Sequence, residues 1–206
     1  MLALVVVGVV TPATEASAQF DLSRALNSLL GGAPAAEGQP TKSGYELLAE
    51  SAPQLSKITG VWLYHSVGLE NLSVNPLADI AIPQVEAYLL AELRGARVSA
   101  GFYGLTVRRN GVVYLSYGDE IYDGKFTYNA DDASLTLSTK IEGVPVSVDG
   151  YLKIEDGRLV VLLDANALLS ALVKAFPEYR TDQTVVSAQS ILKNFTGVYI
   201  ALRHSR

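Results

Sequence analysis

The sequence predicts a mainly β protein: an eight-stranded antiparallel up-and-down β-barrel with helical insertions after the first strand and before the last strand. Three observations predict it. Six short runs rich in β-branched and aromatic residues follow one another between residues 103 and 164, and turn residues separate them at regular intervals. One further run of this kind lies before them and another lies after them. Eight strands joined mostly in sequence would leave two exposed edges in an open sheet, and closure removes both.

The N-terminal segment has the pattern of an export signal. Leu2–Val10 is an unbroken apolar run, and Ala16-Ser17-Ala18 is a small-x-small triplet of the kind that signal peptidase cleaves after. A run of about ten residues is half of the roughly 20 needed to span a bilayer. We therefore expect a signal peptide at 1–18, an exported protein that is periplasmic or extracellular, and no transmembrane span.

The rest of the chain divides into a leader and one domain. Residues 19–43 form an amphipathic leader and a Gly/Pro-rich linker, in which Phe20, Leu22 and Leu26 keep a roughly helical spacing. Such a leader suits docking on a partner or a membrane surface, and it equally suits a marginally ordered tether. The barrel domain is expected at 44–206. With 49% hydrophobic residues in a 206-residue chain, it has enough apolar side chains for a sizeable core.

The domain begins with a helix that leads into the first strand. Helical spacing covers Tyr45–Leu55, and the β-branched and aromatic run Ile58–Tyr64 predicts the first strand. From Leu77 to Leu93 the spacing is helical again, and Pro83 divides this insertion. The insertion lies where it would cover one barrel opening, either as a lid over a cavity or as a plug that completes the core.

Hairpin chemistry defines the next six strands. Asn110-Gly111 is the strongest turn signal, because both residues tolerate the positive φ that a type I′ turn requires. The strands are expected at Leu105–Val107, Val112–Tyr117, Ile121–Tyr128, Leu135–Ile141, Val144–Ile154 and Leu159–Leu163. Consecutive hairpins give an antiparallel meander.

Two helices and a final strand complete the predicted domain. The helices are expected at Ala165–Phe176, capped by Asp164, and at Thr184–Leu192, capped by Thr181 or Asp182. The last strand is expected at Phe195–Leu202, where pairing with the first strand closes the barrel.

Composition excludes several classes of function. The formal net charge is −5 and the 16 basic residues are scattered, which argues against a nucleic acid partner. The absence of cysteine removes disulfides, thiolate zinc sites and the acylated cysteine of a lipoprotein. With His65 and His204 as the only histidines, and with no G-x-S-x-G motif, we expect no catalytic residue, no metal site and no cofactor.

Gly60-Val61-Trp62 in the first strand, preceded by a short helix, resembles the G-x-W signature of the lipocalin and wider calycin superfamily. In that superfamily the Trp lies at the barrel base and a basic residue from the last strand covers it, for which Arg203 is the candidate here. The helical insertion, the run Tyr122–Tyr128, Gly150-Tyr151 and Leu162–Ala165 make the chain similar to an uncharacterised lipocalin-like domain family of secreted Bacteroidota proteins. The resemblance covers roughly Gly44 to the C-terminus. It implies a calycin-type barrel outside the cytoplasm and implies no activity.

Strand alternation predicts which side chains face the interior. If Trp62 points inward, then Gly60, Tyr64 and Ser66 share its face, with Val61, Leu63 and His65 opposite. On the other strands the expected inward residues are Phe126, Tyr128, Leu135, Leu137, Val146, Val148, Val161 and Leu163. The candidate residues that line a ligand cavity are Trp62, Tyr64, Tyr114, Phe126, Tyr128, Leu137, Val146 and Val148.

Two functions are compatible with this barrel. The first is an exported binding protein that holds a small apolar or amphipathic ligand, because an eight-stranded barrel is just wide enough for one. The alternative is a packed structural or protein-interaction module of the cell envelope without a small-molecule ligand. A continuous pocket of a few hundred cubic ångströms would favour the first function, and an interior filled by side chains would favour the second.

Overall fold

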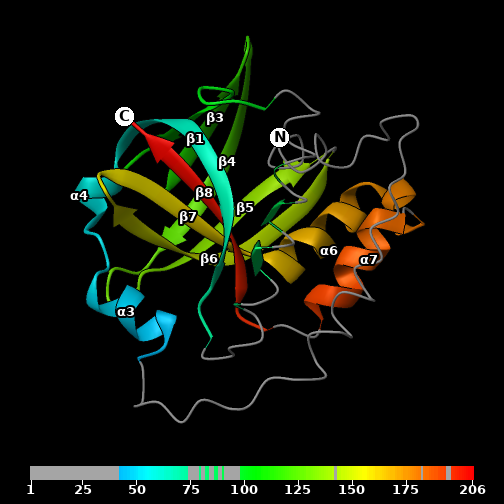
Figure 1. Ribbon diagram of the computed structural model, residues 1–206. Helices are drawn as coiled ribbons and strands as arrows, with labels where there is room; N and C mark the ends of the chain where they lie inside the picture. The colour runs from blue at the N-terminus through cyan, green and yellow to red at the C-terminus, as the bar shows by residue number, and fades with distance from the viewer. Residues whose placement is uncertain are drawn as a thin grey trace.

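The computed structural model describes residues 42–73, 79, 82–83, 86–87, 90, 98–141, 143–181, 183–193 and 196–206. The expected signal peptide, nearly all of the leader, most of the insertion at 77–93 and the candidate cap Asp182 lie outside these residues. Within them the strands form a closed antiparallel barrel in which each strand pairs with the next and the last pairs with the first (Figure 1). The predicted fold class is therefore confirmed. No helix among the described residues is long and apolar enough to cross a membrane.

The strands follow the predicted order, and the six central ones begin and end within one residue of the prediction. They are β1 (Gly60–Asn71), β2 (Gly104–Val107), β3 (Val112–Tyr117), β4 (Glu120–Tyr128), β5 (Ser134–Ile141), β6 (Val144–Glu155), β7 (Arg158–Asp164) and β8 (Val198–Ser205). The bounds of β1 and β8, the two strands whose pairing closes the barrel, differ from the prediction. β1 begins at Gly60 and continues past Tyr64, because β8 pairs with it as far as Asn71. β8 starts later than expected because Gly197, with a φ of +85°, turns the chain just before it.

The single helix expected at Tyr45–Leu55 is two helices, α3 (Gly44–Glu50) and α4 (Leu55–Ile58). Pro53 explains the break, because a proline disfavours helical backbone at the residue before it. α3 begins with a capping box, in which the Ser43 side chain accepts from Glu46 N–H and Glu46 accepts from Ser43 N–H. Figure 1 shows α3 and α4 as two separate helices on one side of the barrel.

A β-bulge in β1 changes the expected inward face. Tyr64 pairs with His204 and Ser66 pairs with Arg203, so His65 is an extra residue on β1. Beyond the bulge the alternation is reversed, and Val67 belongs to the interior core. The expectation that Ser66 shares the face of Trp62 was therefore wrong, because the simple period of two does not survive the bulge.

The other inward assignments agree with the structure. The interior core contains Trp62, Tyr64, Phe126, Leu135, Val146, Val148, Val161 and Leu163, and Tyr128 and Leu137 pack against it. These side chains come from five of the eight strands, so apolar groups converge on the barrel axis from most of its circumference.

The barrel base is closed around Trp62. Its indole Nε1 donates a hydrogen bond to Ile58 O on α4, and the Arg206 guanidinium lies 4.4 Å from the ring centroid. The candidate Arg203 was wrong, because β8 places Ile200, Leu202 and His204 inward and Arg203 outward. Arg206 follows the last residue of β8, and the alternation of Ile200, Leu202 and His204 places it on the inward face. Its side chain therefore covers the barrel base.

Helices after β7 pack at the opposite end of the barrel. α6 (Ala165–Ala175) is capped by Asp164, whose carboxylate accepts from Ala167 N–H at 2.7 Å, as predicted. Its Leu168 is buried in the interior core. A 3-10 helix, η1 (Pro177–Arg180), which the sequence had not indicated, connects α6 to α7 (Gln183–Leu192).

α3 covers one outer wall of the barrel. Its Leu48 joins a second buried cluster with residues that point outward from β7 and β8, namely Val160, Leu162, Tyr199 and Ala201. This wall is therefore apolar on both faces, as the continuous buried run of β7 shows.

Candidate functional site

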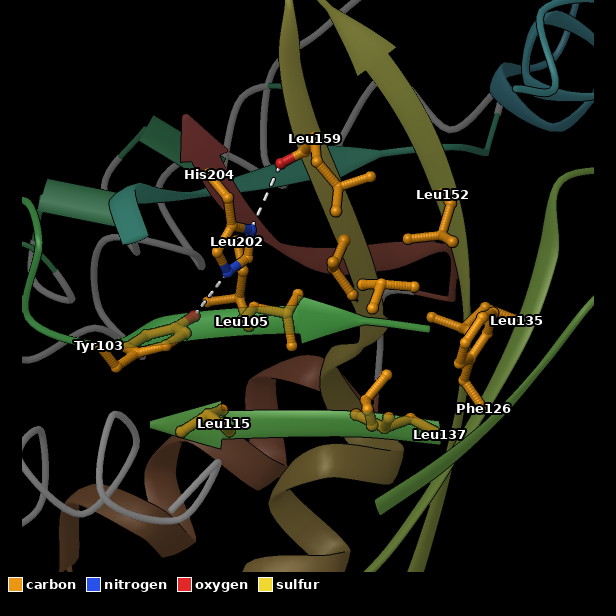
Figure 2. A pocket seen from close by; sticks show the side chains of 13 residues that line it. Tyr103, Leu105, Leu115, Phe126, Leu135, Leu137, Leu152, Leu159, Leu202 and His204 are labelled. Carbon is orange, nitrogen blue, oxygen red and sulfur yellow. Dashed lines mark hydrogen bonds between the residues drawn. The ribbon is translucent and has the colours of Figure 1, made fainter. Parts of the chain in front are cut away.

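The barrel encloses a cavity of about 40 Å³. Figure 2 shows it among side chains that point inward from different strands of the wall. The lining is apolar except at one side, where Tyr103 and His204 meet. The lining residues are Tyr103, Leu105, Val107, Val113, Leu115, Phe126, Leu135, Leu137, Leu152, Leu159, Val161, Leu202 and His204.

Tyr103 and His204 form a hydrogen-bonded pair at the cavity wall. The Tyr103 hydroxyl lies 2.9 Å from His204 Nε2, and His204 Nδ1 lies 3.3 Å from Leu159 O (Figure 2). Because a carbonyl oxygen only accepts, Nδ1 carries the proton and donates to Leu159 O. In the neutral ring Nε2 then accepts, and the Tyr103 hydroxyl donates to it.

Burial keeps both groups of this pair uncharged. His204 is only 1% exposed, and the loss of hydration lowers its pKa to about 4. Burial also raises the pKa of Tyr103 well above its ordinary value. At neutral pH the pair is therefore a neutral hydrogen-bonded unit, which suits an apolar interior.

Aromatic packing fixes the pair in place. The Tyr64 ring stacks on Tyr103 with centroids 5.0 Å apart, and the His204 ring lies edge-on to both. The backbone contributes as well, since Tyr64 N–H donates to Tyr103 O at 2.9 Å. The bulge at His65 follows directly after this contact.

The candidate cavity residues fall into three groups. Phe126 and Leu137 line the cavity. Trp62, Tyr64, Val146 and Val148 belong to the interior core without being among the lining residues, and the Tyr128 hydroxyl donates to Pro53 O. Tyr114 lies on the outer face of β3, between the inward Val113 and Leu115, with the Arg108 guanidinium 5.2 Å from its ring centroid. Tyr114 is therefore outside the cavity.

Sequence reasoning missed the two polar residues of the cavity. The expected strands began at Leu105 and ended at Leu202, so Tyr103 and His204 fell just beyond them. One signal was present for His204: it continues the alternation of Ile200 and Leu202, which places it on the inward face.

The cavity is small for a ligand site. A single water molecule needs a cavity of about 10–15 Å³, so a cavity of about 40 Å³ holds about three water molecules. Pockets that bury drug-sized ligands measure about 300–1,000 Å³. The cavity that these described residues line is therefore too small for a fatty acid or a steroid.

A second feature lies on the outer face of β1 to β4. Strand register aligns Leu63, Gly104, Ser116 and Ile121 in one row across the four strands. The neighbouring row contains Val61, Thr106, Tyr114 and Asp123. We call these two rows the β1–β4 face. Its three aliphatic side chains are largely accessible to solvent, with exposures of 61% for Val61, 47% for Leu63 and 72% for Ile121.

The described residues hold no group of three or more His, Cys, Asp or Glu side chains positioned to bind a metal ion. They also hold no buried side-chain nitrogen or oxygen without a hydrogen-bond partner.

Comparison with known proteins identifies a family. A family model described as a lipocalin-like domain, DUF4923, matches residues 45–206. No curated protein matches the chain. The matched range includes α3 except its first residue, every strand of the barrel, and α6 and α7 after β7.

Proposed function

The chain belongs to the lipocalin-like domain family DUF4923, and from that premise we propose that it is an exported protein-interaction module that binds a macromolecular partner through the β1–β4 face. The observation that carries this proposal is the contrast between the small cavity inside the barrel and the accessible aliphatic side chains on its outer face. A barrel that binds small molecules needs room inside, and this one has about 40 Å³. A barrel that binds a macromolecule needs an accessible apolar surface, which the β1–β4 face provides.

The two outer walls of the barrel differ in how they are covered. Outward side chains of β7 and β8 are buried beneath α3, with Val160, Leu162 and Ala201 fully inaccessible. On the β1–β4 face, Leu63 and Ile121 lie at the two ends of one row, and Val61 lies beside Leu63. Isolated exposed apolar residues are ordinary in soluble proteins, whereas a cluster of them is typical of an interaction surface.

A cross-linking experiment tests this proposal. A photo-reactive amino acid is placed at Ile121, and in a control chain at Leu47, which is 52% exposed on α3. In the native host we expect a specific adduct from position 121 and none from position 47. The adduct should disappear when Leu63→Lys is added and persist when Val186→Lys is added, since Val186 is an exposed residue of α7. Equal adducts from both positions, or an adduct indifferent to Leu63→Lys, would refute the proposal.

A second candidate function is the binding of a compact amphipathic molecule of a few heavy atoms in the cavity. The Tyr103–His204 pair favours it. The Tyr103 proton is directed to His204 Nε2, so the hydroxyl oxygen retains lone pairs that accept a hydrogen bond from a ligand. A short-chain alcohol has the matching chemistry, with an apolar body and one donor.

Methyl NMR under xenon pressure and with 1-propanol tests this second function. Xenon is a probe of dry apolar cavities. Saturable shifts of the Leu137 and Val161 methyl groups with both probes would support ligand binding, and shifts with xenon alone would support a dry packing defect. Methyl groups of Leu48, which lies outside the barrel, serve as the control. No shift with either probe would remove the cavity as a binding site.

A further inference from the structure

The β1–β4 face carries opposite charges at its two ends. Arg108 and Arg109 lie at the β2–β3 turn, and Asp119 and Glu120 lie at the β3–β4 turn. All four residues are exposed. β3 separates the two groups, and its six residues span about 20 Å at roughly 3.4 Å per residue. The face therefore has basic residues at one end and acidic residues at the other, with the exposed Val61, Leu63 and Ile121 between them.

This arrangement is complementary to itself. Arg108, Arg109 and Lys125 balance Asp119, Glu120 and Asp123, although the whole chain has a formal net charge of −5. None of the ion pairs between described residues involves Arg108, Arg109, Asp119 or Glu120. Two copies therefore meet without net repulsion at this face, and their charged ends are available to one another.

We propose that the partner of the β1–β4 face is a second copy of the chain, related by a two-fold axis that lies in the interface at right angles to the strands. The inference rests on the proposed function and names the partner of the same surface. A two-fold axis across the strands reverses the ends, so Arg109 of one copy faces Asp119 of the other. A two-fold axis along the strands would instead set basic end against basic end, which charge repulsion opposes.

The aliphatic residues of β1 fit this symmetry. Two-fold dimers use the same patch on both subunits, and this is the commonest arrangement of soluble homo-oligomers. With the axis between the two rows, Leu63 of each copy lies over Val61 of the other. Gly104 has no side chain and Ser116 has a small one, so the middle of the face does not protrude. The larger side chains of the two copies can therefore approach one another. Because the outer face of a barrel is convex, the contact is restricted to these rows, and the dimer should be weak and concentration-dependent.

Sedimentation velocity over a range of protein concentrations tests the proposal. We expect the mean mass of the wild-type chain to rise toward that of a dimer, and Leu63→Lys to keep it monomeric at every concentration. Leu47→Lys adds the same charge on α3 and should leave the self-association unchanged. A wild-type chain that remains monomeric throughout would overturn the inference.

Charge reversal tests the orientation of the two copies. Arg109→Glu or Asp119→Lys alone should weaken the dimer by about fivefold, the upper range for surface charge pairs. The double variant should restore it, because each reversed charge again meets its opposite across the two-fold axis. Both side chains are exposed, so neither substitution threatens folding, which circular dichroism verifies. If the loss of dimer affinity in the double variant equals the two single losses combined, this arrangement is refuted.

The outcomes separate this inference from the proposed function. If the wild-type chain is monomeric but position 121 still cross-links to a different protein, the proposal of self-association is refuted and the proposed interaction function is supported. If neither self-association nor a specific adduct occurs, both fail.

Discussion

Acidification should destabilise the protein through His204, well before carboxylates with ordinary pKa values are protonated. The folded protein holds the His204 pKa at about 4 because burial removes the hydration of the charged ring. In the unfolded chain the same group has its ordinary pKa of 6.5. As the pH falls below 6.5, the unfolded state binds a proton that the folded state does not. Stability is therefore complete above pH 6.5 and is lost progressively as the pH falls toward 4.

The expected loss follows from these two pKa values. At pH 5 the unfolded state has gained about 2 kcal/mol from protonation of His204, and the folded state has gained almost nothing. This is a large fraction of a total stability of about 5–15 kcal/mol. Because Tyr103 donates to Nε2, protonation of His204 in the folded state would also reverse that hydrogen bond, with Nε2–H donating and the Tyr103 hydroxyl oxygen accepting.

Urea denaturation at pH 7.5 and pH 5, followed by the fluorescence of the single Trp62, measures the loss. The double variant His204→Leu/Tyr103→Phe removes both partners of the hydrogen bond. The difference of about 2 kcal/mol in unfolding free energy between pH 7.5 and pH 5 should therefore disappear. His65→Asn removes the other histidine and should retain it. A His204 imidazole that titrates near pH 6.5 in NMR spectra of the folded protein would refute the reasoning, as would a double variant with an unchanged pH dependence.

Three further predictions concern stability. Arg206→Met should increase acrylamide quenching of Trp62 while it costs less than about 1 kcal/mol, because the guanidinium covers the ring but lies at the surface. Glu70→Gln should cost about 2 kcal/mol in urea denaturation, since it removes the less exposed of the two carboxylates that pair with Lys153 and Arg203 and leaves them only Glu155. In contrast, Glu50→Gln, in an exposed pair, should change stability by less than about 0.5 kcal/mol. Gly150→Ala should cost at least about 3 kcal/mol or prevent folding, because an added Cβ would overlap a backbone carbonyl of β7, and a thermal melt within a few degrees of wild type would contradict this.

The sequence predicted best those elements whose signals are local. Asn110-Gly111 and the other hairpin turns define the central strands directly. The type I′ turn predicted at Asn110-Gly111 was wrong, because Gly111 has a positive φ and Asn110 does not; the turn is closed by Gly111 N–H, which donates to Arg108 O. The Asp164 cap of α6 is another local signal that the structure confirms. Each depends on neighbouring residues alone, so a single sequence contains the information.

The cavity pair could not be predicted in the same way. Tyr103 and His204 are 101 positions apart and meet only because β8 closes against β1. Tyr103 precedes its strand, and its place is fixed by the Tyr64 backbone rather than by any pattern around it. Likewise, the covering of Trp62 depends on the register of β8, which decides between Arg203 and Arg206.

The bulge at His65 determines which side chains of β1 enter the barrel. Without it, the period of two from Trp62 would direct Gly68 and Glu70 inward. With it, Glu70 lies on the outer wall, where its carboxylate pairs with Lys153 and Arg203 at 2.9 Å each, and Val67 takes the interior position. A buried charge without a partner is costly, so the extra residue is what makes a twelve-residue β1 compatible with an apolar core.

Deletion of His65 should therefore prevent folding, whereas His65→Ala should be tolerated. The deletion restores the simple alternation and forces either Glu70 into the core or the whole strand out of register with β8. The substitution keeps the bulge, because an extra residue is required there and the imidazole is not part of the interior core. Circular dichroism and thermal melting of the two variants measure the difference. A deletion variant that melts like the wild-type protein would show that β1 can shift its register freely, and the bulge would then not determine the inward face.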